Sequence, residues 1–358
     1  MTRHRWSHVL CAAVALMLSL LFQRVGGQSA QDKGGIDETG PYVAVENWFQ
    51  PLHEGRAQCV LGVYAESANR IYLTTEVEVA SSAPSGPCTA ERDKPNTHSH
   101  FILVVDGNGR VIEDWSQWNS LFGLPHAVRV NPYDPEKHVW IVNRDAHQIH
   151  EFTHDGTRLI RTLGEKDVRG DDDRHFGLPA DVAFLPDSSF LVADGYGNSR
   201  IVKFDKRGTY LSAWGTNGSG RGQFRVPHGV AVDAQRRVYV ADRDNRRIQI
   251  FDENGRYLDE WPDIRGIVQV MPTSDQAVWA LTGTTNRLLK YGLSGALMTY
   301  WGTSNTGRSF PGSLMAPHAF SVDPDGNVYV ADYRNHRVQK FVARATASRD
   351  RLIGSPVK

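Results

Sequence analysis

The sequence has little of three things: net charge, cysteine and long apolar stretches. Its 358 residues contain 40 Lys and Arg against 40 Asp and Glu, which argues against a dedicated nucleic-acid binder, because phosphate neutralisation needs a basic excess. The 3 cysteines are too few for a disulfide scaffold. In contrast, 33 Gly, 17 Pro and 10% aromatic residues indicate a turn-rich globular protein with ample core material.

The N-terminus has the pattern of an export signal. Basic residues at 3–5 precede an apolar run over 9–22, and small residues follow at 25–27. The run is shorter than the ~20 residues of a spanning helix, so residues 1–27 are predicted to be a secretory signal peptide and residues 28–40 a linker. An uncleaved anchor is the alternative. We expect a monomer, secreted or periplasmic, with no membrane attachment after signal cleavage.

Two cysteines remain when the signal is removed, Cys59 and Cys88. In an oxidising compartment such a remainder indicates one disulfide bond. Their spacing excludes a CxxC-type metal pair.

The middle of the chain repeats itself. Three segments nearly superimpose, at 176–215, 224–261 and 316–341, and each combines a Pro-led apolar strand, a Val-rich strand ending in Ala-Asp and an alternating strand. Weaker copies follow the same order, at 60–115, 124–164 and 267–302. Six copies of a four-stranded unit predict an all-β fold, a six-bladed β-propeller over residues 41–343.

The last copy lacks its fourth strand, since the chain after Phe341 becomes polar. The segment 42–49 has strand character and belongs to no blade. We expect this N-terminal strand to close the ring and to remove the exposed edge. Residues 344–358 are predicted to be a loose polar tail.

Histidine follows the Pro that opens the innermost strand in alternate blades, at His126, His228 and His318. Alternate blades of a six-fold ring lie about 120° apart, so the three imidazoles are expected to converge on the axis. Three protein ligands with an open position are typical of catalytic Zn²⁺. The alternative is that Pro-His is a recurrent packing feature of the repeat and that neutral histidines fill the central channel. The histidines at 98, 100, 147, 150 and 154 are expected to be solvated.

A second ring is expected just beyond the Ala-Asp strand ends, at the mouth of the channel. It contains Arg144, Tyr196, Arg243 and Tyr333. Arg243 is suited to hold a carboxylate and Tyr196 to act as a base beside a metal. The alternative for each is ordinary turn chemistry.

These motifs resemble a known family. The repeats resemble NHL repeats, and the His/Tyr/Arg set resembles peptidyl-α-hydroxyglycine α-amidating lyase (peptidylamidoglycolate lyase), the zinc-dependent half of peptide C-terminal amidation. The resemblance covers essentially the whole mature chain and is strongest at 170–182, 194–202 and 241–249. It implies cleavage of an N-acyl- or peptidyl-α-hydroxyglycine to an amide and glyoxylate.

The resemblance also implies residue roles. The zinc ligands would be His126, His228 and His318, the base would be Tyr196, and Arg243 would anchor the substrate. Glu76 stands where the family has an active-site Arg, and Arg144 is the candidate replacement. Ala319 replaces the Asp that holds a structural Ca²⁺ in the family, which puts Ca²⁺ in doubt although backbone carbonyls near Val60 and Val128 remain.

Other departures concern cysteine and domain content. Family disulfide cysteines fall at Gly197, Tyr239 and Ile250, so a Cys59–Cys88 bridge would be a different one. The chain carries no companion copper monooxygenase domain.

Three functions remain open at this point. The first is a secreted lyase of the amidating type. The second is a metal-dependent hydrolase or lyase with another small substrate, because fold does not fix function. The third is a non-catalytic NHL propeller that binds a protein or glycan partner.

Overall fold

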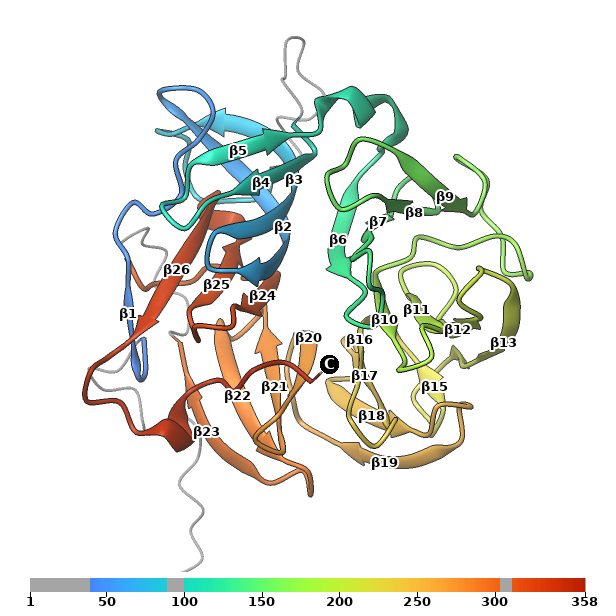
Figure 1. Cartoon of the computed structure of the whole chain (residues 1–358). Coiled ribbons are helices and arrows are strands. Elements are labelled where there is room, and N and C mark those ends of the chain that lie inside the picture. The colour runs from blue at the N-terminus through green and yellow to red at the C-terminus, as the bar shows by residue number, and fades with distance from the viewer. Residues whose placement is uncertain (1–38, 89–99, 303–310, 358) are drawn as a thin grey trace, which may run out of the picture. The chain divides into compact units, whose positions relative to one another are not determined.

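The computed structural model describes residues 39–88, 100–302 and 311–357, and these form six four-stranded antiparallel sheets arranged as blades around an axis (Figure 1). Blade 1 contains β2 (Arg56–Ser67), β3 (Arg70–Ala80), β4 (Ile102–Val105) and β5 (Val111–Asp114). Blade 2 contains β6 (Pro125–Val130), β7 (Val139–Asn143), β8 (Gln148–Phe152) and β9 (Leu159–Leu163). Blade 3 contains β10 (Asp181–Phe184), β11 (Phe190–Asp194), β12 (Arg200–Phe204) and β13 (Tyr210–Trp214).

The remaining blades follow the same order. Blade 4 contains β16 (Pro227–Val232), β17 (Val238–Asp242), β18 (Arg247–Phe251) and β19 (Tyr257–Trp261), after a short pair β14 (Thr216–Asn217) and β15 (Gln223–Phe224). Blade 5 contains β20 (Ile267–Thr273), β21 (Ala277–Thr282), β22 (Arg287–Gly292) and β23 (Leu297–Trp301). Blade 6 contains β24 (Ala319–Val322), β25 (Val328–Asp332), β26 (Arg337–Ala343) and β1 (Tyr42–Ala44). The prediction of a six-bladed propeller is confirmed.

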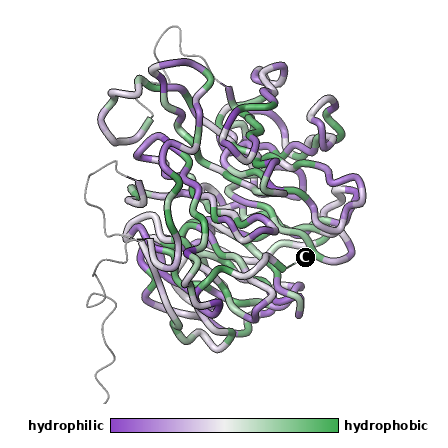
Figure 2. Tube along the Cα trace, turned by 60° about the vertical axis from the view of Figure 1, so that its left-hand side comes forward, coloured by the Kyte–Doolittle hydropathy of each residue, from purple (hydrophilic) through white to green (hydrophobic). Residues whose placement is uncertain are grey.

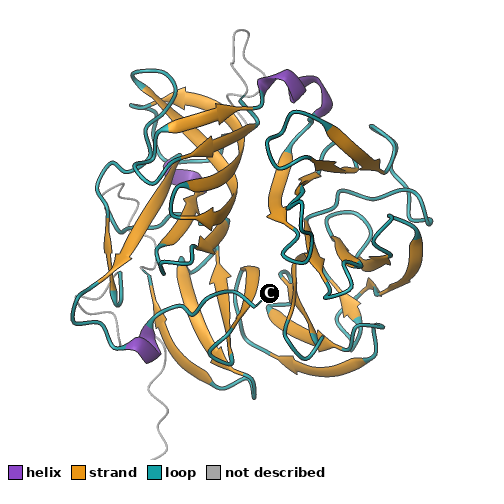
Figure 3. Cartoon of the chain, viewed as in Figure 1, coloured by secondary structure: helices purple, strands orange, loops and turns teal. Residues whose placement is uncertain are grey.

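Helix is confined to short 3₁₀ turns in the described residues (Figure 3). They are η1 (Ser116–Leu121), η2 (Tyr333–Asn335) and η3 (Arg349–Arg351). None of the helices in the described part of the chain is long and apolar enough to cross a membrane. The predicted signal peptide at 1–27 and the linker up to residue 38 lie outside the described residues.

The ring is closed by the N-terminal strand, as predicted. β1 pairs antiparallel with β26, with Tyr42 opposite Ala343 and Ala44 opposite Phe341. The strand is shorter than the predicted segment 42–49, although the Val45 amide still donates to the Lys340 carbonyl at 2.8 Å. This pairing covers the edge that blade 6 would otherwise expose.

The expectation that residues 344–358 are loose is wrong for the described part of that segment. Ile353 is buried, and its amide donates to the Tyr42 hydroxyl at 2.8 Å. The Val357 amide donates to the Pro272 carbonyl at 3.1 Å. The tail is polar in composition, but it lies along blade 5 because backbone groups there accept and donate hydrogen bonds.

The hydrophobic core lies between neighbouring blades. One buried cluster joins blades 5 and 6 around Trp279 and Phe320, and others join the remaining neighbouring pairs. The second strands are buried along their whole length in blades 2 to 6. Hydrophobic stretches accordingly run through the inside of the molecule and polar ones mark its loops (Figure 2).

A buried acidic residue ends the second strand of the strong repeats and anchors the loop before the inner strand. In blade 4, Asp242 Oδ1 accepts from the Arg225 amide at 2.8 Å, and Oδ2 accepts from Arg247 Nε at 2.8 Å. Asp194 and Asp332 likewise accept one bond from a backbone amide and one from an arginine. In blade 2, Asn143 Oδ1 accepts the backbone amide of Gly123. The Ala-Asp signature therefore fixes the start of each inner strand in these blades.

The predicted disulfide is confirmed. Cys59 in β2 and Cys88 after β3 are bonded, with Cα atoms 6.3 Å apart, and both are buried. The bridge ties the long β2–β3 hairpin of blade 1 to the chain that follows it.

Candidate metal centre and substrate pocket

Three histidines meet at the channel axis. His126 lies on β6, His228 on β16, and His318 immediately before β24. Their ring centroids are 4.9, 4.6 and 5.0 Å apart, and the candidate ligand nitrogens lie within 4.8 Å of one another. The structure thus brings together the three residues predicted from alternate blades.

Each imidazole is oriented by a backbone carbonyl. Nδ1 of His126 lies 2.7 Å from the Ala180 carbonyl, Nδ1 of His228 lies 2.7 Å from that of Val268, and Nδ1 of His318 lies 2.9 Å from that of Leu61. A carbonyl only accepts, so each Nδ1 carries the proton and each Nε2 keeps a free lone pair. This is the outer contact that orients metal-binding imidazoles.

The three imidazoles are held neutral. Burial, with repulsion among the rings and from nearby guanidinium groups, keeps the pKa of His126 and His228 well below the ordinary value of 6.5. Burial likewise lowers the pKa of His318 to about 4. Neutral nitrogens directed at one point suit a three-ligand zinc site.

Tyr196 lies against this cluster. Its hydroxyl is 3.1 Å from His126 Nε2, 2.8 Å from His228 Nε2 and 3.3 Å from a guanidinium nitrogen of Arg243. The guanidinium carbons of Arg144 and Arg243 lie 5.0 and 5.1 Å from the centre of its ring. The phenol of Tyr196 therefore lies between the axial imidazoles and two guanidinium groups.

The loops that carry these residues are held by the strained turns before the inner strands. The Tyr196 amide donates to the Leu178 carbonyl at 3.2 Å, and the Arg243 amide donates to the Val226 carbonyl at 3.1 Å. Leu178 and Val226 have φ values of 64° and 58°, a region that residues with a β-carbon rarely adopt. Strain of this kind is characteristic of functional sites.

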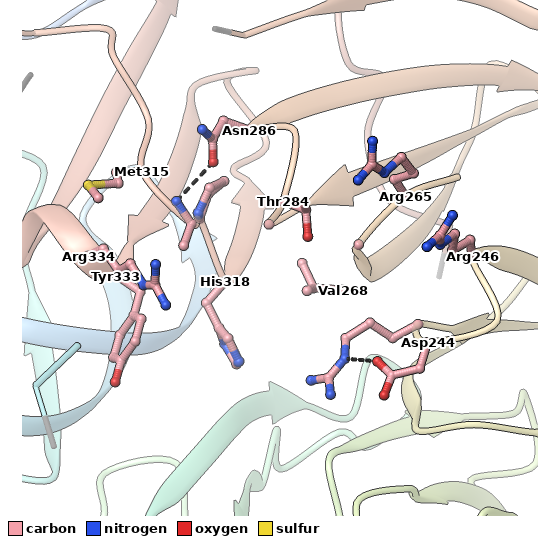
Figure 4. A pocket seen from close by; sticks show the side chains of 15 residues that line it. Asp244, Arg246, Arg265, Val268, Thr284, Asn286, Met315, His318, Tyr333 and Arg334 are labelled. Carbon is pink, nitrogen blue, oxygen red and sulfur yellow. Dashed lines mark hydrogen bonds and ion pairs between the residues drawn. The ribbon is translucent and has the colours of Figure 1, made fainter. Parts of the chain in front are cut away.

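A pocket of about 650 Å³ opens beside the histidines, over blades 4 to 6 (Figure 4). Its wall includes His318, Tyr333 and four guanidinium groups. The cationic residues are Arg243, Arg246, Arg265 and Arg334. Asp244 is the one acidic residue that lines it among those described, and it pairs with Arg243 at 2.8 Å. The pocket therefore favours an anionic ligand.

The other side of the histidines is closed. Arg129 pairs there with the buried Asp181 at 2.9 Å, and only about 10 Å³ of space remains. Arg129 also donates to the Val128 carbonyl at 2.9 Å. With Ala319 offering no carboxylate and a guanidinium on that carbonyl, the residues present do not fit Ca²⁺, which needs six to eight oxygen ligands.

Glu76 is buried near the mouth of the channel. Its carboxylate accepts from the Tyr333 hydroxyl at 3.0 Å, and Tyr333 lines the pocket beside His318. A carboxyl side chain thus stands at the position where the resemblance implies an arginine. Arg144 supplies positive charge beside Tyr196. Burial is the main reason why the pKa of each of the three histidines is low, and the charge of Arg144 lowers it further.

The structure brings Arg144, Tyr196 and Arg243 to the three histidines, while the roles of these residues stay predictions. The sequence did not single out Arg246, Arg265 or Arg334. A signal existed for Arg246 and Arg334, because they lie in the same loops as Arg243 and Tyr333. His150, expected to be solvated, is buried on β8, and His100, expected to be solvated as well, has a buried Nε2. His98 lies outside the described residues.

Comparisons with known proteins agree with this architecture. A family model for the NHL repeat matches residues 224–251 and 314–341. Over 253 residues the chain is 30% identical to peptidyl-glycine alpha-amidating monooxygenase B of Xenopus laevis, covering 67% of this chain and 28% of that protein. Over 166 residues it is 32% identical to a probable peptidyl-alpha-hydroxyglycine alpha-amidating lyase of Caenorhabditis elegans, covering 46% of each. NHL repeat-containing protein 3 of Mus musculus is 29% identical over 254 residues, covering 67% of this chain and 72% of that protein.

The chain spans only 28% and 46% of the two amidating relatives. Among solved structures, a streptogramin B lyase superimposes with a TM-score of 0.55 at 12% identity, over 85% of this chain and 97% of that one, which supports the fold alone. The protein is therefore an NHL-repeat six-bladed β-propeller. In sequence it resembles the peptidyl-α-hydroxyglycine α-amidating lyases.

Proposed function

We propose that the protein is a zinc-dependent lyase that cleaves an N-acyl- or peptidyl-α-hydroxyglycine to an amide and glyoxylate, acting outside the cytoplasm. One observation carries the proposal: the Tyr196 hydroxyl touches two of the three axial imidazoles while two guanidinium groups flank its ring. The name of the Caenorhabditis elegans relative, a probable peptidyl-alpha-hydroxyglycine alpha-amidating lyase, supports the reaction class.

The residues at the axis would have two kinds of role, binding the zinc ion and binding the substrate. His126, His228 and His318 would hold zinc, which when bound acts as a Lewis acid towards the substrate hydroxyl oxygen. Arg243, at the edge of the cationic pocket, is placed to anchor the substrate carboxylate. Arg144 would add a second positive charge, with its guanidinium carbon 5.0 Å from the centre of the Tyr196 ring.

Tyr196 is placed to move the proton. As the general base it takes the proton of the substrate hydroxyl. The electron pair left on that oxygen forms the carbonyl of glyoxylate while the carbon–nitrogen bond breaks. The amide nitrogen keeps the bonding pair and takes up one proton, so the products are a primary amide and glyoxylate.

The test is glyoxylate release from N-benzoyl-α-hydroxyglycine. Tyr196→Phe should lower kcat by about 10²- to 10⁴-fold, the usual worth of a general base, while the zinc content stays that of the wild type. Tyr210→Phe, at a half-exposed tyrosine of the outer strand β13, is the matched control and should behave as wild type. Unchanged kcat in Tyr196→Phe would exclude this residue as the base.

The buried Glu76 favours a second candidate, a metal-dependent lyase or hydrolase with a different small substrate. Its carboxyl group, bonded to the Tyr333 hydroxyl, offers no cationic anchoring point for a second carboxylate. Zinc binding without glyoxylate release in the same assay would select this candidate.

A further inference from the structure

A second group of potential metal ligands lies in blade 1, away from the axial histidines. It consists of His53 before β2, Glu78 near the end of β3 and His100 before β4. One nitrogen or oxygen atom of each lies within 4.8 Å of those of the other two. The rings of His53 and His100 are 5.6 Å apart. The resemblance to amidating lyases assigns no role to these residues.

Two of the three residues present a buried atom that has no hydrogen-bond partner within the described part of the chain. Glu78, 1% exposed, has one carboxylate oxygen on His53 Nδ1 at 2.9 Å, while its Oε1 is unpartnered. Nε2 of His100 is also buried and unpartnered. Buried polar atoms in native proteins are almost always satisfied, so each such atom requires an explanation.

His100 is oriented as metal-binding histidines are. Its Nδ1 lies 2.7 Å from Asp114 Oδ2 at the end of β5, so the carboxylate accepts the Nδ1 proton and Nε2 is left with its lone pair. A carboxylate behind an imidazole is the arrangement that fixes the ring and raises its basicity towards a metal. The Thr75 hydroxyl donates to the His100 carbonyl and holds the backbone at the same point.

The surroundings suit a cation with an entry path. Glu78 lies opposite Gln58 in the β2–β3 hairpin, so their side chains share one face, and Gln58 Oε1 is buried without a partner too. The side chain of His53 is 53% exposed, which opens the group to solvent. Three buried acceptor atoms with no donor among the described residues suit a positive ligand. Arg56 is also near, with Nε 3.9 Å from Glu78 Oε2, but its hydrogen bond goes to the Glu78 backbone carbonyl at 3.0 Å.

We propose that His53, Glu78 and His100 bind a second divalent transition metal, with Zn²⁺ the first candidate. Two imidazoles and one carboxylate match the ligand types that zinc takes in three-ligand sites, and imidazole does not select Ca²⁺ or Mg²⁺. Bound metal would join the chain before β2, the extended hairpin and the start of β4. This site is independent of the proposed lyase function, because its residues come from blade 1 and the axial histidines from blades 2, 4 and 6.

The test counts zinc in the full chain after stripping and dialysis against buffered free Zn²⁺ at neutral pH. Wild type should hold about two zinc ions, and His228→Ala and His100→Asn about one each. His154→Asn, a partly exposed histidine paired with Glu66, is the matched control and should hold about two. The double variant His228→Ala, His100→Asn should hold none.

Cobalt absorption distinguishes the two sites, and circular dichroism shows whether each variant is folded. Co²⁺ added to His228→Ala should give visible d–d absorption, and Glu78→Gln in that background should remove it without changing the far-ultraviolet circular dichroism. Glyoxylate release should persist in His100→Asn if the axial site is the lyase centre. A zinc count in His100→Asn equal to that of the wild type, or no cobalt absorption in folded His228→Ala, would overturn the second site whatever the outcome for the lyase.

Discussion

At the residue scale, Tyr196 shows how one side chain depends on its neighbours in sequence. Gly195, directly before it, lies against the backbone of Pro227, and a β-carbon at Gly195 would overlap the Pro227 carbonyl oxygen. Pro227 precedes the axial His228. A glycine is therefore required where the loop of Tyr196 and the strand of His228 approach through their backbones.

Gly195→Ala should disturb both residues at once. We expect zinc affinity and glyoxylate release to fall together by at least about tenfold, the lower range for disturbed support of a metal ligand. Zinc competition and kinetics on the same preparation would measure this. Gly222→Ala is the control, because a β-carbon there meets nothing within 4 Å, although its φ of 71° adds backbone strain. Full zinc affinity in Gly195→Ala would show that the contact is not constraining.

His150 provides a pH test outside the metal centre. Burial lowers its pKa from 6.5 to about 4, and its ring nitrogens contact Asn143 and Thr162. Between these pH values the unfolded chain binds a proton that the folded protein does not. Its contribution to stability is therefore complete above about pH 6.5 and is lost as the pH falls towards 4.

His150→Gln should flatten this dependence. Between pH 7 and 5.5 the wild type should lose about 1 kcal/mol more than the variant in free energy of unfolding, measured by urea denaturation. The axial histidines are present in both proteins, so their contribution cancels. Parallel pH profiles would contradict the burial of a neutral His150.

Single residues were predictable where they occupy the same position in several repeats. The three Pro-His steps and the loop positions of Tyr196 and Arg243 recur at fixed places, so the sequence alone placed them in rings. Arg265 lies outside that period, and the pairing of Glu76 with Tyr333 joins blades 1 and 6. Contacts made across the ring leave no local pattern, which is why these were missed.

At the element scale, the second strand of each strong repeat positions the first. Asp242, fully buried, accepts from Arg225, Asn245, Arg247 and Gln249. Burial raises the pKa of its carboxyl, against the opposing effect of these donors. The loop that it holds leads directly into the strand carrying His228.

Asp242→Ala should therefore destabilise the protein by about 3–5 kcal/mol, because it breaks the buried ion pair with Arg247, which keeps only the partly exposed Glu260 as an acidic partner, and leaves the Arg225 amide without its acceptor. Chemical denaturation would measure the loss. Asp259→Ala, at an exposed position of the neighbouring β19, should stay within about 0.5 kcal/mol of wild type. A small loss in Asp242→Ala would mean that the ion pair is not needed to anchor the loop.

The strands themselves were largely predictable, because apolar periodicity and turn residues recur in each blade. The closing strand β1 was found from what blade 6 lacked. The packing of residues 344–357 was not found, since it depends on backbone hydrogen bonds to Pro272 and Tyr42 rather than on apolar spacing. The ion pair of Arg129 with Asp181, between blades 2 and 3, was equally invisible.

At the scale of the whole molecule, the ring of six blades brings equivalent positions of the repeat together at the axis. Clusters between neighbouring blades hold the ring together, and histidine in every second blade brings three imidazoles, rather than six, to the axis. On the side of Arg129 only about 10 Å³ of space remains, whereas the cationic pocket on the other side has about 650 Å³. A ligand therefore has room beside the histidines on the pocket side.

The measurement that tests this account most directly compares wild type with His228→Ala for zinc content and for glyoxylate release from N-benzoyl-α-hydroxyglycine. We predict that the variant holds about one zinc ion fewer per chain and releases no glyoxylate, while keeping the wild-type circular dichroism. A wild type that binds no zinc at the axial histidines and releases no glyoxylate would contradict the account. The histidines would then fill the channel of a non-catalytic NHL propeller.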